Sequence, residues 1–222
     1  MKRDNGTTYI YSLIAEGEHV RQDFKFEISD ARKIAKTLSA FANTQGGRLL
    51  VGVKDNGRIA GISSEEEVYM IDAAATLYCR PTVSYTTENY RVEGRTVLLV
   101  EIPESEEKPV YALDEEGKPW AYLRVADENI LATPVHLRIW QQSGDRRGEL
   151  LAFTEHERLL LQHLQAEGCL TLNRCCRLAR LPRYTTERLL ARLIRYDIVE
   201  PVFENHRFTF RLMASHSHEP LV

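Results

Sequence analysis

Arginine residues gather in one short stretch toward the end of this 222-residue chain. Seven arginines and one acidic residue, Glu187, fall between residues 174 and 195, so the stretch carries a local charge of +6. The arginines are Arg174, Arg177, Arg180, Arg183, Arg188, Arg192 and Arg195. A guanidinium group can donate two parallel hydrogen bonds to a phosphate or to the major-groove edge of guanine. The stretch therefore indicates a focused nucleic-acid-binding surface.

A helix predicted over the second half of this stretch would present several of these arginines on one face. Arg188, Arg192 and Arg195 recur at helical spacing opposite a face of leucines. Thr185 and Thr186 lie at the N-terminus of the helix, where recognition helices usually meet base edges. The predicted contacts with nucleic acid are Arg183, Tyr184, Thr185, Thr186, Arg188, Arg192, Arg195 and Arg207. The other interpretation is that these arginines form a solvated face of a domain that dimerises or binds a protein.

The surrounding sequence predicts a small domain that would position this helix. Within residues 150–214, helices are expected at 154–168, 171–179 and 185–196, and strands at 199–203 and 207–212. Three helices followed by a hairpin is the element order of a winged helix-turn-helix. Polar and glycine residues at 143–149 predict a linker before this domain, and residues 215–222 a flexible tail.

Residues 1–142 predict a separate domain in which helices and strands are mixed. Helices are expected around 10–14, from an N-cap at Ser29 to Ala42, from a capping box of Ser64 and Glu67 to about Cys79, and from Pro134 to Gln141. Strands are expected at 20–26, 49–53, 58–62, 82–88, 90–92, 96–102, 110–113 and 120–125, with a hairpin turn at 55–57. The predicted fold class is α+β, with a mixed sheet and few helices.

Several motifs of the first region follow one another in an order and spacing that a known family shares. Gly17-Glu18 precedes Asp23-Phe24-Lys25, and the block from Ala40 to Gly61 contains Gly46-Gly47 and a buried strand. This pattern resembles the Schlafen AlbA-like domain family over residues 9–140, including the entry motif in which Gly-Glu precedes Glu-Phe-Lys. The resemblance implies a domain regarded as nucleic-acid-binding in bacterial members, where a winged helix often follows in regulator-like proteins.

The same resemblance also implies an alternative activity. Some animal Schlafen proteins are metal-dependent RNA endonucleases, and their three carboxylates would correspond to Glu18, Asp23 and Asp55, with Lys25 as a further candidate for catalysis. Three carboxylates can hold Mg²⁺ or Mn²⁺, which neutralises phosphoryl charge and activates water. This chain departs from the pattern because Asp23 stands where the family has a glutamate, which retracts a ligand by one methylene. Asp55 begins a predicted turn, a position that favours Asp for its own backbone hydrogen bonds. We therefore assign no catalytic or metal-binding residue.

Other cofactors are not expected. The segment Gly52–Gly57 has the glycine spacing of a P-loop, but Arg58-Ile59 stands where Lys and Ser/Thr would contact phosphate and Mg²⁺, so ATP is not predicted. The four cysteines form no C-x-x-C pair, so a zinc site is not predicted.

The composition is typical of a cytoplasmic globular protein. The chain is 43% hydrophobic and 27% charged, with neither a secretion signal nor a run of apolar residues that could cross a bilayer. Residues 150–222 hold ten arginines and eight acids, a net charge of +2, so the other residues carry −5 of the total of −3. We expect a DNA-binding protein of transcription-regulator type that is not an enzyme and forms a homodimer. Its expected partner is double-stranded DNA, with RNA as a further possibility and no membrane.

Overall fold

The computed structural model describes residues 2–62, 65–142 and 153–214, which form two compact units. The first unit is Met1–Ala132 and the second is Thr133–Val222. The boundary predicted after residue 142 differs from this division, because helix α4 (Pro134–Gln142) packs with the second unit through the buried side chain of Val135. The linker predicted at 143–149 and the tail predicted at 215–222 lie outside the described residues.

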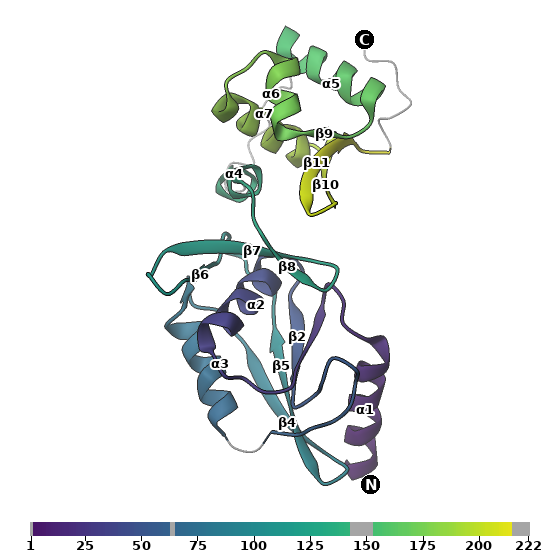
Figure 1. Ribbon diagram of the computed structural model, residues 1–222, viewed down its shortest axis with the longest axis vertical. Helices are drawn as coiled ribbons and strands as arrows, with labels where there is room; N and C mark the ends of the chain where they lie inside the picture. Colours follow the sequence, from purple (N-terminus) through teal and green to yellow (C-terminus); the bar gives the residue numbers. More distant parts are fainter. Residues whose placement is uncertain (1, 63–64, 143–152, 215–222) are drawn as a thin grey trace. The chain divides into compact units, whose positions relative to one another are not determined.

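The first unit is built on a mixed four-stranded sheet (Figure 1). Its strands are β1 (Gln22–Lys25), β2 (Gly47–Val51), β5 (Arg95–Ile102) and β4 (Thr86–Val92), in that order across the sheet. β1 and β2 are parallel, and the other pairs are antiparallel. The predicted α+β class with a mixed sheet is confirmed.

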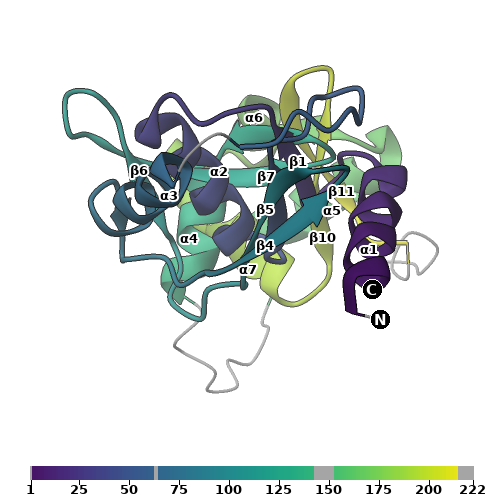
Figure 2. The ribbon, with the colours of Figure 1, turned by 90° about the horizontal axis from the view of Figure 1, so that it is seen from below.

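Helices cover both faces of this sheet. Helix α1 (Lys2–Glu16) lies on one side, and α2 (Ala31–Asn43) and α3 (Glu66–Thr76) lie on the other (Figures 1 and 2). Because side chains alternate along a strand, Leu50 of β2 joins the α1 side of the core, whereas Leu49 joins the side of α2 and α3. The strands β1, β2 and β5 are therefore largely buried on both faces, whereas most residues of the edge strand β4 are exposed.

A second four-stranded sheet packs against α2. Its strands, in order, are β3 (Cys79–Arg80), β6 (Tyr111–Leu113), β7 (Pro119–Val125) and β8 (Glu128–Leu131). The amide of Asn43 fastens α2 to the second sheet: it donates to the carbonyls of Val110 and Tyr122 and accepts from the N–H of Val110. This packing brings β7 close to the start of β1.

Several element boundaries of the first unit differ from the sequence predictions. Asp30, not Ser29, caps α2, because its carboxylate accepts from the N–H of Arg32. The strands predicted at 82–88 and 90–92 correspond to the single strand β4, which begins only at Thr86 and which a two-residue turn at 93–94 pairs in register with β5. The hairpin predicted around 55–57 is a turn closed by one isolated bridge, and α3 ends at Thr76 instead of Cys79. Ser64 of the predicted capping box lies outside the described residues.

The second unit consists of helices and a small antiparallel sheet. After α4 come α5 (Glu155–Glu167), β9 (Leu170–Thr171), α6 (Leu172–Ala179), α7 (Arg183–Arg195), β10 (Val199–Glu204) and β11 (Arg207–Leu212). The strand order is β10-β11-β9, and leucines of α5 and α7 pack around Phe210. Thr154 and Glu157 form a capping box that starts α5. The helices and strands predicted here are present, with α7 beginning two residues earlier than expected.

Among the described residues, no helix combines the length and the apolar character needed to cross a membrane.

Candidate nucleic-acid interface and carboxylate cluster

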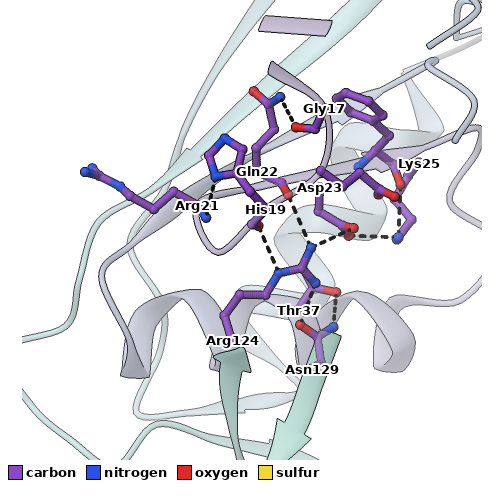
Figure 3. Close-up of polar contacts among 11 residues, drawn as sticks. Gly17, His19, Arg21, Gln22, Asp23, Lys25, Thr37, Arg124 and Asn129 are labelled. Carbon is purple, nitrogen blue, oxygen red and sulfur yellow. Dashed lines mark hydrogen bonds and ion pairs between the residues drawn. The ribbon is translucent and has the colours of Figure 1, made fainter. Parts of the chain in front are cut away.

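Asp23 on β1 is buried, and each of its carboxylate oxygens lies beside a cation of the same unit (Figure 3). Oδ1 lies 3.1 Å from Nη2 of Arg124 on β7. Oδ2 lies 2.8 Å from Nζ of Lys25, an ion-pair distance without the directionality of a hydrogen bond. A cation beside each oxygen offsets the cost of burying a carboxylate. Asp23 is therefore neutralised within the protein.

Arg124 is buried as completely as Asp23, and the N–H groups of its guanidinium donate to oxygens of the same unit. It donates to the backbone carbonyls of His19 at 3.4 Å and Gln22 at 3.2 Å, and to Oδ1 of Asn129 at 3.0 Å. Its guanidinium also lies 5.2 Å from the centre of the Phe41 ring. These contacts tie β7 of the second sheet to β1 of the first, as Figure 3 shows. The arginine thus has a structural role as the internal counter-ion of Asp23.

Glu18 joins the same cluster. Its Oε1 accepts from the N–H of Phe24 at 2.9 Å. Burial, and next the hydrogen bond with the Asp23 carboxyl, raise the pKa of Glu18 above its ordinary value. The structure therefore brings together three of the sequence candidates, Glu18, Asp23 and Lys25.

Asp55, the remaining carboxylate candidate, is not part of this group. It lies in the exposed turn that the N–H of Gly57 closes on the carbonyl of Lys54. Among the residues that the structure describes, no three side chains of His, Cys, Asp or Glu could hold one metal ion. Since Arg124 and Lys25 already flank Asp23, this donor set does not fit Mg²⁺ or Mn²⁺.

In the second unit, the first turns of α7 present an exposed basic and aromatic surface. Arg183, Tyr184, Thr185 and Arg188 are exposed, and the Tyr184 side chain reaches 59% exposure. The Tyr184 ring has the guanidinium of Arg138 at 4.1 Å and that of Arg188 at 6.0 Å from its centre. These four residues of α7, which we call the α7 surface, were all predicted as contacts with nucleic acid.

Two other predicted contacts on α7 turn toward the protein. Thr186 is 0% exposed, and its hydroxyl donates to the carbonyl of Pro182 at 3.1 Å. It shares the buried face of the helix with Leu189 and Leu190, so its hydroxyl does not reach the surface where the contact with nucleic acid is predicted. Arg192 is half-buried and forms an ion pair with the buried carboxylate of Glu157 on α5.

The three other predicted arginine contacts, Arg195, Arg207 and Arg183, differ in how exposed they are and in what they contact. Arg195 is half-buried near the end of α7. Arg207 is exposed where β11 begins, directly after the turn formed by Asn205 and His206, both of which have positive φ. Arg183 lies 3.1 Å from Glu187 and 3.2 Å from the side-chain oxygen of Asn173, yet its side chain is 59% exposed.

Sequence reasoning missed Arg138, which supports the α7 surface from α4. Its guanidinium lies 3.0 Å from the buried Glu187 carboxylate, whose other oxygen pairs with Arg183. Arg138 is not among the predicted contacts because the sequence pattern assigns residues 134–142 to the first domain. Helical spacing alone does not show which neighbour a helix packs against.

Comparisons with known proteins bear chiefly on the first unit. Residues 18–133, just over half of the chain, match the family described as Schlafen, AlbA_2. Among curated proteins, none matches the chain.

Solved structures resemble the chain only weakly. The DIP2311 protein of Corynebacterium diphtheriae is 19% identical over 86% of this chain, which spans 37% of that protein, with a TM-score of 0.47. The N-terminal domain of a RecG-related protein from Nitrosomonas europaea is 23% identical over 68% of this chain and 95% of its own, with a TM-score of 0.43. A MarR family transcriptional regulator from Silicibacter pomeroyi is 23% identical over 28% of this chain and 41% of its own, with a TM-score of 0.26. Scores this low carry no argument about function.

Proposed function

We propose that this chain, which belongs to the Schlafen AlbA_2 family, is a DNA-binding protein of transcription-regulator type. Family membership relates its function to nucleic acids. The observation that carries the proposal is the α7 surface, where Arg183, Tyr184, Thr185 and Arg188 are exposed together while the opposite face of α7 is buried. The element order of the second unit supports it, because three helices followed by a hairpin is the order of a winged helix-turn-helix.

In this proposal, α7 enters the major groove with its N-terminal turns first. Thr185 and Arg188 would face base edges, where Arg can pair bidentately with guanine. Arg183 and Tyr184 would contact phosphates at the groove edge, which sets the register of the protein on the duplex. Arg207, beside the β10–β11 turn, would contact the backbone or the minor groove.

The ion pairs around Glu187 support this role by orienting the surface. Arg183 and Arg138 both hold the buried Glu187 carboxylate, so the start of α7 is fastened to α4. A preorganised contact loses less entropy on binding than a mobile one. We further propose that two copies bind paired half-sites, which sedimentation of the protein with and without duplex would test.

Binding of duplex DNA by matched variants of the full chain tests the proposal. Fluorescence anisotropy of a labelled duplex would be measured across a salt series for wild type, Arg188→Ala and Arg158→Ala. Arg158 is an exposed arginine of α5, so its replacement removes the same charge away from the α7 surface. We expect Arg188→Ala to weaken binding about 5- to 100-fold and to relax the discrimination between bases at the position that Arg188 contacts, with Arg158→Ala close to wild type.

Other outcomes would contradict the proposal. Equal losses in both variants would show that the binding is general charge attraction. Absence of salt-dependent binding would make a protein the better candidate partner of the α7 surface.

The alternative of a metal-dependent ribonuclease has one observation in its favour, which is that Glu18 accepts from the N–H of Phe24, the residue next to Asp23. It requires Mg²⁺ or Mn²⁺ at a site whose central carboxylate faces Arg124 and Lys25 instead. Incubation of structured RNA with either metal, followed by a denaturing gel, tests it. Cleavage that Glu18→Gln abolishes would establish the nuclease.

A further inference from the structure

Strand β4 forms one edge of the four-stranded sheet of the first unit, where it pairs with β5. It is seven residues long, keeps a continuous register with β5 and contains no proline, and residues 86–89 are all exposed. An exposed edge strand presents a row of unpaired N–H and C=O groups to other chains. Proteins usually protect such an edge with a short strand, a proline or covering groups. β4 is neither short nor interrupted by proline.

The other sheet edges of the described residues are protected. β3 and β9 have two residues each, β8 has four, and β10 contains Pro201. β1, at the opposite edge of the same sheet as β4, has four residues whose backbone is engaged by side chains. The N–H of Phe24 donates to Glu18, and the carbonyl of Gln22 accepts from Arg124. Among the described residues, β4 is therefore the long unprotected edge.

The hairpin geometry identifies the backbone groups that β4 leaves unpaired. Both residues of the turn at 93–94 have positive φ, as in the two-residue turns whose flanking residues exchange hydrogen bonds. In an antiparallel pair, these bonds recur at every second residue. Counting back from Val92, the N–H and C=O groups of Thr87, Asn89 and Arg91 point away from β5. No described residue forms a hydrogen bond with them.

These outward groups are complementary to those of a second copy of the same strand. Two β4 strands related by a twofold axis perpendicular to the sheet run antiparallel to each other. The register centred on Asn89 overlaps the whole strand. Asn89 then lies opposite Asn89 of the second copy, and Thr87 lies opposite Arg91. Each outward N–H therefore faces an outward C=O.

The side chains also match across this axis. Glu88 lies opposite Tyr90 of the second copy, and within one chain the Tyr90 hydroxyl already donates to the Glu88 carboxylate at 2.7 Å. The same donor and acceptor can therefore pair between copies. Arg91 faces Thr87, so no two like charges lie directly opposite each other, an arrangement that would destabilise the pairing.

Exposed tyrosines of α1 lie beside the same edge. Tyr9 is 37% exposed, and its ring centre lies 5.7 Å from that of Tyr90 on β4. Tyr11 is 41% exposed, and its hydroxyl donates to Glu93 in the turn that follows β4. Tyrosine is enriched at protein interfaces, so these residues favour a protein surface as the neighbour of this edge.

We infer that β4 pairs with β4 of a second copy of this chain, so that two four-stranded sheets join into one continuous sheet across an axis at Asn89. The interface lies in the first unit and forms without nucleic acid, so it does not rest on the DNA-binding proposal. It supplies the contact between the two copies that are proposed to bind paired half-sites.

Sedimentation equilibrium of the full chain without DNA, over a wide range of concentrations, tests this inference. Asn89→Pro removes the outward N–H of each copy and leaves the ladder to β5 in place. Because the axis repeats the change, two hydrogen bonds are lost, and we expect the dimer to weaken about 5- to 100-fold. In the wild-type dimer, the amides of Thr87, Asn89 and Arg91 should exchange hydrogen more slowly as the protein concentration rises.

Charged variants give a test that does not depend on proline being tolerated in β4. Asn89→Asp and Asn89→Lys each place two like charges opposite each other, and each should weaken its own dimer about 2- to 5-fold. An equal mixture of the two variants pairs opposite charges and should dimerise at least as tightly as wild type. Asn56→Asp and Asn56→Lys are the matched controls, because Asn56 is exposed in the turn at 55–57 instead of on β4.

Three results would each overturn the inference. They are a monomer at every concentration, a dimer that folded Asn89→Pro leaves as tight as wild type, and charged Asn89 variants that dimerise alone as tightly as in their mixture. Arg188→Ala should leave the dimer unchanged while it weakens duplex binding. The failure of the β4 interface is thus distinguishable from the failure of the DNA-binding proposal.

Discussion

The protein uses charged side chains in two opposite ways. The Asp23–Arg124 pair is buried and holds the first unit together, whereas Arg183 and Arg188 of α7 are exposed. Arg124 has a side chain 2% exposed and donates to a carboxylate and three oxygens of its own unit. Arg188 is exposed on α7, with its guanidinium 6.0 Å from the centre of the Tyr184 ring. A buried charge is tolerated only when it is paired and hydrogen-bonded, whereas an exposed guanidinium keeps its donors for a ligand. The contrast separates charges that build the fold from charges available for binding.

The same contrast divides α7 internally. Arg192 is one turn from Arg188, yet its guanidinium pairs with Glu157, whose side chain is 6% exposed. A net charge counted along the sequence therefore overstates the cationic surface of the helix.

Replacement of Arg124 should lower the free energy of unfolding of the first unit by more than any other change considered below. Arg124→Met leaves the Asp23 carboxylate buried without its main counter-ion and removes the link from β7 to β1. Breaking a buried pair from one side costs about 3–5 kcal/mol. Urea unfolding of the Trp140→Phe background, followed by the fluorescence of Trp120 in the first unit, measures the change.

Arg21→Met is the matched control, because Arg21 is an exposed arginine directly before β1. It should change the free energy of unfolding by no more than about 0.5 kcal/mol. Similar losses in both variants would show that Arg124 is no more important to the fold than a surface arginine.

The second unit contains a buried ionisable group of its own, His136 on α4. Burial lowers the pKa of His136 to about 4, and its ring contacts Phe208 at 4.6 Å between ring centres. The folded state therefore keeps the ring neutral, while the unfolded chain takes up a proton below about pH 6.5. Stability should fall by about 3 kcal/mol as the pH is lowered from about 6.5 to about 4.

Urea unfolding at several pH values, followed by Trp140 in a Trp120→Phe background, measures this dependence. His136→Gln should reduce the dependence of the second unit's stability on pH. The control variant His163→Gln, on α5, should leave that dependence as in the wild type. A profile unchanged by His136→Gln would assign the acid sensitivity to other groups.

Arg192 and Arg188 provide the sharpest test within one helix. Arg192→Ala removes the cation from buried Glu157 and should destabilise the second unit by about 2 kcal/mol. Arg188→Ala should cost less than about 0.5 kcal/mol of stability but weaken duplex binding. Thermal unfolding and anisotropy on the same samples separate the two effects. If Arg192→Ala keeps full stability and lowers the salt slope, Arg192 belongs to the interface as the sequence predicts.

Local patterns explain which of these features were predictable from the sequence. Helical periodicity located α2, α5 and α7, because apolar residues repeat every three or four positions along them. The same rule explains why one of two neighbouring threonines at the start of α7 is buried and the other is exposed. Thr186 falls on the face of Leu189, Leu190 and Leu193, whereas Thr185, one residue earlier, falls on the exposed face.

Long-range pairing was not predictable in this way. Arg124 and Asp23 are 101 residues apart, and their contact depends on how α2 packs the second sheet against the first. The pairing of Arg138 with Glu187 likewise depends on the docking of α4. Sequence composition identifies such residues as charged, and only the tertiary structure shows that they neutralise one another.

The smallest expected effect concerns metal ions at the carboxylate cluster. A divalent cation bound only by the folded protein raises its stability in proportion to the logarithm of its concentration. Because Arg124 and Lys25 flank Asp23 while Asp55 is exposed elsewhere, millimolar Mn²⁺ should leave the unfolding temperature of the first unit unchanged. Thermal unfolding with Mn²⁺, with Mg²⁺ and with EDTA measures this. A rise with either metal that Glu18→Gln removes would place a cation at the cluster, despite its internal counter-ions, and would favour the nuclease over a purely structural role for these carboxylates.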